Sequence, residues 1–210
     1  MILPPCPYHH RMDYSKLLIA MANPPDRQSL EEYLRMIVDT LPTPTPTYCI
    51  VGALALGAWG RIRSTKDIDL LVIAEESERK HLAGTLGLGG FVLDQQWLDL
   101  NPFASERVNR FLHPSYDGTP LDIIFAADQH EEEMLQRRQA IDILGINTWV
   151  CGPEDLILMK LKASRPHDFE DVTSIVVNPN LQLDLDYLWS WAERLGLQSE
   201  LHYVLISSKS

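Results

Sequence analysis

The chain has 210 residues, 45% of them hydrophobic, and a formal net charge of −11 at pH 7. This length allows one well-packed domain of ordinary globular composition. The acidic balance excludes a protein that binds nucleic acid non-specifically through its overall field. No apolar run approaches the roughly 20 residues that span a bilayer, so we expect no membrane partner. The cysteines Cys6, Cys49 and Cys151 show no CxxC spacing. Their spacing indicates a reducing compartment, and we expect a cytoplasmic location.

The first part of the chain alternates helix and strand signals. Residues 1–24 are rich in proline and are interpreted as an N-terminal tail. Apolar residues at helical spacing predict a helix over 29–41, which the run "PTPTPT" ends. The β-branched run "YCIVGA" at 48–53 predicts a strand, and "LALGAWG" predicts a short helix that Gly60 closes.

The stretch "STKDIDLLV" at 64–72 has the alternation and apolar end of a buried strand. Asp67 and Asp69 are two residues apart, so they share one face of that strand, roughly 7 Å apart. Two like charges at the start of a core strand repel each other, and a divalent cation would remove the repulsion. The alternative is that either aspartate caps a turn or faces solvent.

The remaining elements follow in order. A helix is predicted over 77–87, whereas 91–107 supports no assignment. Residues 107–126 predict two strands joined by a turn at Asp117-Gly118, and 140–151 predict another strand pair. Three helices are predicted to close the chain, at 153–164, 166–177 and 184–196. The stretch 130–135, "HEEEML", is interpreted as the solvated start of a helix rather than a metal site.

Two further features point toward a metal-nucleotide site. Asp122 lies within the apolar strand "PLDIIFA", where a single acid is costly unless it is paired or bound to a metal. The stretch "VGALALGAWG" runs from a strand through a glycine turn into a helix, which presents backbone N–H groups to an anion. The alternative for this turn is simple helix packing. Three acids on two strands beside such a turn fit a site for a metal ion and a nucleotide.

The ordered set "VGALALGAWGRIRSTKDIDLLV", "PLDIIFA" and "PEDLILMKLKASRPHDFEDV" resembles the nucleotidyltransferase superfamily. It is most similar to small bacterial toxin-like members of abortive-infection and toxin–antitoxin systems, over residues 47–177. The resemblance implies an α+β fold with a mixed β-sheet flanked by helices. The core would cover 25–152, and 153–210 would form a C-terminal helical part of the same domain.

The resemblance also assigns roles to individual residues. Asp67, Asp69 and Asp122 match the catalytic and metal-binding acids, and Asp122 is the candidate base or second-metal ligand. Gly52 and Ala53 match the phosphate-loop pair, Lys160 a phosphate-contacting lysine, and Asp168 and Asp171 an accessory acidic pair. The family pair is usually Gly-Gly or Gly-Ser, so backbone groups or Ser64 must replace a missing hydroxyl here.

The residues that precede the acid pair complete the expected nucleotide site: Arg63, Ser64, Thr65 and Lys66. Arg63 and Lys66 would clamp phosphates or the acceptor, and the alternative is a solvated basic turn. For Lys160 the alternative is a side chain that only extends to the surface.

The expected function is Mg²⁺-dependent transfer of a nucleoside monophosphate from an NTP to an acceptor hydroxyl, with Mn²⁺ as a second candidate ion. RNA, a protein side chain and a small molecule remain open as acceptors, and an antitoxin is a candidate partner. The alternatives are an inactive binding module with the same fold and a hydrolase or nuclease that uses the same metal site.

Overall fold

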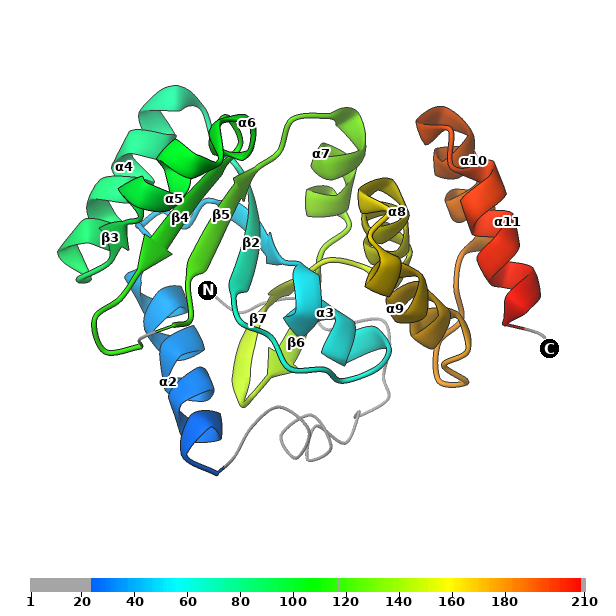
Figure 1. Ribbon diagram of the computed structural model, residues 1–210, viewed down its shortest axis with the longest axis horizontal. Coiled ribbons are helices and arrows are strands. Elements are labelled where there is room, and N and C mark those ends of the chain that lie inside the picture. The colour runs from blue at the N-terminus through cyan, green and yellow to red at the C-terminus, as the bar shows by residue number, and fades with distance from the viewer. Residues whose placement is uncertain (1–23, 117, 209–210) are drawn as a thin grey trace.

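The computed structural model describes residues 24–116 and 118–208 (Figure 1). The predicted tail at 1–24 therefore lies outside the described residues apart from Pro24, and so does Asp117 of the predicted turn. Within the described part of the chain, no helix combines the length and apolar character needed to cross a membrane.

Seven strands form one mixed sheet in the order β3-β4-β5-β2-β1-β7-β6. The strands are β1 (Thr47–Ile50), β2 (Ile68–Ile73), β3 (Val92–Leu93), β4 (Val108–Leu112), β5 (Leu121–Phe125), β6 (Gln139–Ile143) and β7 (Ile146–Val150). The pairs β2–β5 and β1–β7 are parallel, and the other neighbours are antiparallel. The expected mixed sheet is confirmed, together with both predicted strand pairs.

Helices flank this sheet, as predicted. They are α2 (Pro24–Thr40), α3 (Gly52–Trp59), α4 (Glu76–Leu88), α5 (Gln95–Leu100), α6 (Pro102–Ser105), α7 (Gln129–Gln136), α8 (Pro153–Ala163), α9 (Pro166–Val176), α10 (Leu185–Leu195) and α11 (Gln198–Ser207). Figure 1 shows α4 and β3 at one end of the molecule and α10 and α11 at the other. The first predicted helix begins earlier than expected, at Pro24, and α11 is a fourth C-terminal helix that the prediction missed.

The centre of the sheet is covered on both faces. Neighbouring residues Leu70 and Leu71 of β2 are both fully buried, although their side chains point to opposite faces. Helix α8 packs against α3, which follows β1 directly. The C-terminal helices therefore fold back onto the part of the sheet where the Asp-bearing strand begins.

A polar cluster joins α7 and α8 to α10. The Tyr187 hydroxyl donates a hydrogen bond of 2.5 Å to Asp155 Oδ1, and Asp155 is fully buried. Burial and the Asp155 charge raise the pKa of Tyr187 far above its ordinary value. The helix start expected at 130–135 is confirmed by α7, and Glu132 and Glu133 are exposed there, but His130 and Glu131 are buried, so this start is only partly solvated.

Candidate active site

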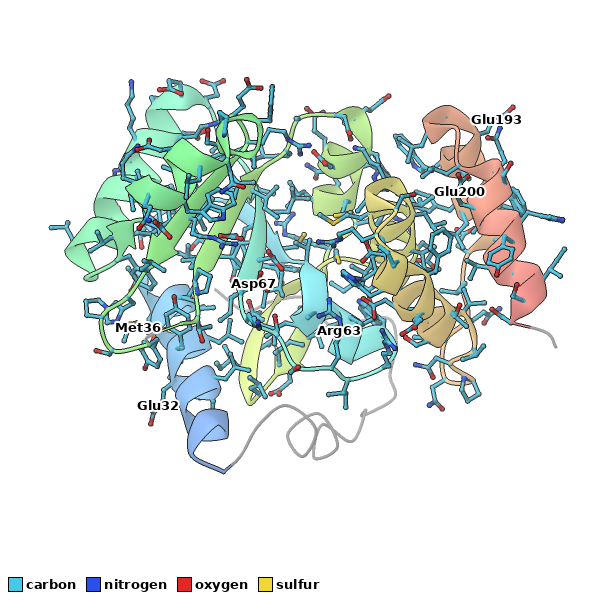
Figure 2. All side chains as sticks on the ribbon, viewed as in Figure 1. Glu32, Met36, Arg63, Asp67, Glu193 and Glu200 are labelled. Atoms are coloured by element: carbon cyan, nitrogen blue, oxygen red, sulfur yellow. The ribbon has the colours of Figure 1, made fainter. Side chains whose placement is uncertain are left out.

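Three carboxylates converge where the two parallel strands β2 and β5 begin. Asp69 and Asp122 are register partners on β2 and β5, and Asp67 lies two residues before Asp69 on the same face. One oxygen from each of the three side chains lies within 4.8 Å of the others. Figure 2 shows Asp67 at the entry to β2. The parallel register thus brings together the three acids that the sequence predicted as a metal site.

This arrangement makes Asp69 costly to ionise. Burial, followed by repulsion from Asp67 and Asp122, raises the pKa of Asp69 from 3.8 to about 7. The positive charges of Arg165 and Arg110 offset only part of this rise. A carboxylate that is costly to ionise beside two other acids is the local condition that a bound cation would relieve.

Gly52 sits directly against Asp69. Its φ is +66°, in the left-handed region that favours glycine. A Cβ at this position would lie 2.0 Å from Asp69 Oδ2, which is far inside contact distance. The backbone N–H of Val51 also donates to the Asp69 carbonyl at 3.0 Å. Only glycine therefore allows this turn and the Asp69 carboxylate to lie so close together.

The same turn forms the N-terminus of α3. Val51 is the N-cap residue, and a valine side chain cannot accept hydrogen bonds from the first amides of the helix. Both Gly52 and Ala53 line a cavity of about 630 Å³ that also contains the three acids. Free amides at a helix N-terminus favour an anion, so this wall of the cavity suits a phosphate group.

The loop before β2 contributes three of its four predicted residues to the cavity. Arg63, Ser64 and Lys66 line the same cavity as the Gly-Ala turn, and Ser64 is exposed there. Thr65 does not line the cavity; its hydroxyl donates to Asp67 Oδ1 at 3.0 Å and to the Asp67 carbonyl at 2.7 Å. Thr65 thus orients Asp67, one of the three converging acids.

Lys160 lines the cavity but is held by two carboxylates. Its Nζ lies 3.2 Å from Asp168 Oδ1 and 2.7 Å from Asp171 Oδ2, and the lysine is 3% exposed. It therefore does not extend to the surface. Burial opposes ionisation of Asp171, but hydrogen bonds from Lys160 and Arg61 outweigh it and lower the Asp171 pKa.

Arg63 and Arg165 connect this ion-pair cluster to the cavity. Arg63 Nε donates to Asp171 Oδ2 at 3.3 Å, and Arg165 Nε donates to Asp168 Oδ2 at 2.8 Å. Figure 2 shows Arg63 next to α3. Asp168 and Asp171 themselves do not line the cavity, so their contacts are with the basic residues around it.

The sequence prediction missed Arg110, Arg165 and His167, which also line the cavity. Arg110 lies opposite Asp122 in the antiparallel β4–β5 register and donates to both of its oxygens, at 2.7 and 2.6 Å. The acid that was predicted to need a pair or a metal is therefore paired with an arginine. The signal was an arginine within a predicted strand, but its register with Asp122 was not readable.

The residues fit a hard divalent cation. Asp67, Asp69 and Asp122 offer only oxygen ligands, which Mg²⁺ and Mn²⁺ prefer. Burial, together with the charges of the two neighbouring acids, makes Asp69 costly to ionise without a cation. Such an ion would neutralise part of the negative charge that the three carboxylates bring together.

A mixed sheet with an acid pair on one strand, a third acid on its parallel neighbour and a glycine turn beside them defines a nucleotidyltransferase-like protein. The antibiotic-resistance factor ANT(2'')-Ia shares this fold: its solution structure matches with a TM-score of 0.55 and 14% identity, covering 84% of this chain and 98% of that one.

Two crystal structures are less similar. JHP933 from Helicobacter pylori matches with a TM-score of 0.47 and 17% identity, over 86% of this chain and 79% of that one. An antigenic nucleotidyltransferase-like protein from Paracoccidioides brasiliensis matches with a TM-score of 0.39 and 18% identity, over 75% and 83%. A search of curated proteins finds no significant match.

The sequence itself places the chain in a family. Residues 28–204 match the family described as "Nucleotidyltransferase of unknown function (DUF6036)", and the chain belongs to it. The resemblance to nucleotidyltransferases that the motifs indicated is confirmed at the level of family and fold.

Proposed function

We propose that this protein transfers a nucleoside monophosphate from an NTP to an acceptor hydroxyl, with Mg²⁺ as its ion. The observation that carries the proposal is the convergence of Asp67, Asp69 and Asp122 within 4.8 Å beside the Gly52 turn. These three acids would hold the ion, which supplies charge neutralisation at the phosphates.

The chain's own residues account for binding and positioning. The amides of Gly52 and Ala53 and the side chains of Lys66 and Ser64 face the cavity where the triphosphate would lie. Lys160 contributes positive charge from within its ion-pair cluster. Catalysis would then consist mainly of positioning and of stabilising charge as it develops.

The overall reaction is balanced without another reactant. The acceptor oxygen forms a bond to the α-phosphorus, the bond from that phosphorus to the bridging oxygen of the β-phosphate breaks, and pyrophosphate leaves. The hydroxyl proton passes to a base or to solvent. The acceptor would be RNA, a protein side chain or a small molecule, and action as a toxin with an antitoxin partner is part of the same proposal.

The phosphate of the NTP that carries an isotopic label distinguishes the proposed reaction from its alternatives. Purified protein is incubated with Mg²⁺, cell lysate and each NTP labelled at either the α- or the γ-phosphate. The proposal predicts an acceptor fraction that gains α-label and no γ-label. Free labelled mononucleotide with no labelled acceptor would favour the hydrolase, and no turnover of any NTP would favour the inactive module.

The accessory acid pair, Asp168 and Asp171, has a structural role in this proposal. We propose that Asp168 and Asp171 hold Lys160 and the neighbouring arginines in place rather than binding a second ion, because their oxygens accept hydrogen bonds from these basic groups. Because of these contacts, removing the Lys160 side chain from the cavity wall would disturb the fold.

A further inference from the structure

We propose that Arg110 acts as a built-in cation at Asp122, so that the acid trio takes one divalent ion rather than two. This inference rests on the proposed function and specifies how its metal site is composed. Arg110 is a positioning residue in this account, because it acts through Asp122.

The pairing of Arg110 with Asp122 occupies both oxygens of the carboxylate. Nε donates to Oδ1 at 2.7 Å and Nη2 to Oδ2 at 2.6 Å, the fork geometry that makes arginine–carboxylate pairs strong. The two side chains are 20% and 9% exposed, so water screens the pair only weakly. Removing the arginine would leave a largely buried carboxylate without its partner.

Arg110 is also fixed from its other side. The centre of its guanidinium lies 4.5 Å from the centroid of the Trp97 ring, within the range of a cation–π contact. Trp97 belongs to α5, and its backbone N–H donates to Asp94, the N-cap residue of that helix, at 2.9 Å. The arginine is thus held between an aromatic ring and the third acid of the site. A lysine would keep the charge but lose the planar fork.

The charges of the three acids and Arg110, taken together, balance with a single ion. Three ionised acids carry −3, and the Arg110 guanidinium reduces this to −2, which one divalent cation neutralises. A second divalent ion at Asp122 would face a like charge that is already hydrogen-bonded to both oxygens. Asp67 and Asp69 have no comparable bidentate arginine among the hydrogen bonds of the described residues, which leaves them as the principal ligands.

The test counts bound Mn²⁺, because its unpaired electrons distinguish free from bound ion by electron paramagnetic resonance. Wild type, Arg110→Gln, Arg110→Lys and Arg107→Gln are each titrated with Mn²⁺ alone. Arg107 is the matched control, since it forms a 2.6 Å ion pair with Glu131 and does not line the cavity. Melting curves first establish which variants are folded.

We expect one Mn²⁺ per chain for wild type, Arg107→Gln and Arg110→Lys, and a second, weaker Mn²⁺ for Arg110→Gln. Two ions in wild type would overturn the inference and leave the proposed function standing. One ion in folded Arg110→Gln would also overturn it, because the charge of Arg110 would then not set the count. No bound Mn²⁺ in wild type would overturn both this inference and the proposed function. If Arg110→Gln does not fold, the wild-type count still decides.

Discussion

Replacing Gly52 with alanine should damage both the fold and the metal site. An alanine at φ +66° costs about 1–2 kcal/mol, because its Cβ crowds the following carbonyl oxygen. The new methyl carbon would also lie 2.0 Å from Asp69 Oδ2, and moving that side chain off its rotamer costs about 0.5–1.5 kcal/mol more. We expect a loss of about 1.5–3.5 kcal/mol, which lowers Tm by about 3–14 °C in a chain of this size.

The matched control is Gly84→Ala on α4. A Cβ at Gly84 meets no atom within 4 Å, and the position is helical, so alanine should stabilise by about 0.5–1 kcal/mol. Thermal melts show whether the two alanine substitutions change stability in opposite directions, and Mn²⁺ titrations show whether only Gly52→Ala weakens ion binding. In a double-mutant cycle, Asp69→Ala should restore about 1 kcal/mol to Gly52→Ala, because it removes the clashing carboxylate. A Gly52→Ala protein that melts and binds Mn²⁺ like wild type would refute the contact between turn and acid.

Three other substitutions test separate parts of the structure. Asp69→Asn should raise the free energy of unfolding of the metal-free protein by on the order of 1–3 kcal/mol at pH 8. Because the pKa of Asp69 is raised from 3.8 to about 7 in the folded state, wild-type stability should fall relative to the variant as pH rises between these values, and equal stabilities at pH 8 in denaturant titrations would contradict this. Lys160→Ala should lose about 1.5–3 kcal/mol, because its two buried aspartates lose a charged hydrogen-bond donor although Arg61, Arg63 and Arg165 still contact them. The more exposed Lys162→Ala should lose under about 1 kcal/mol. Similar melting temperatures for the two lysine variants would exclude a buried role for Lys160. Tyr187→Phe should lose about 1–2 kcal/mol with its hydrogen bond to Asp155, and an unchanged Tm would show that this bond does not help to hold α10.

Local patterns in the sequence were enough to predict much of the fold and the acid trio. Asp67 and Asp69 share a face by the two-residue period of a strand, and their place beside Asp122 follows once β2 and β5 are parallel neighbours. The glycine turn was recognisable because a β-branched run leads into a glycine and then into a helical segment, although the helix begins at Gly52, inside the range predicted as strand.

The partners of the charged residues could not be predicted because they depend on register and packing. A two-residue turn at 117–118 would pair Arg110 with residue 125, whereas the longer loop from 113 to 120 pairs it with Asp122. Lys160 was expected at a phosphate or at the surface, but the packing of α9 against α8 brings two aspartates to its Nζ. Spacing along one helix carries no information on what a second helix places beside it.

Calorimetric titration of ATP, GTP, CTP and UTP, with and without Mg²⁺, tests the central proposal most directly. We predict that at least one nucleotide binds at millimolar concentration or below, that binding requires Mg²⁺, and that folded Asp67→Asn loses it because the ion loses a ligand. Gly84→Ala, a surface change on α4, should bind like wild type. Absence of binding heat for all four nucleotides in the presence of Mg²⁺, or equal binding without it, would contradict a metal-dependent nucleotidyltransferase site.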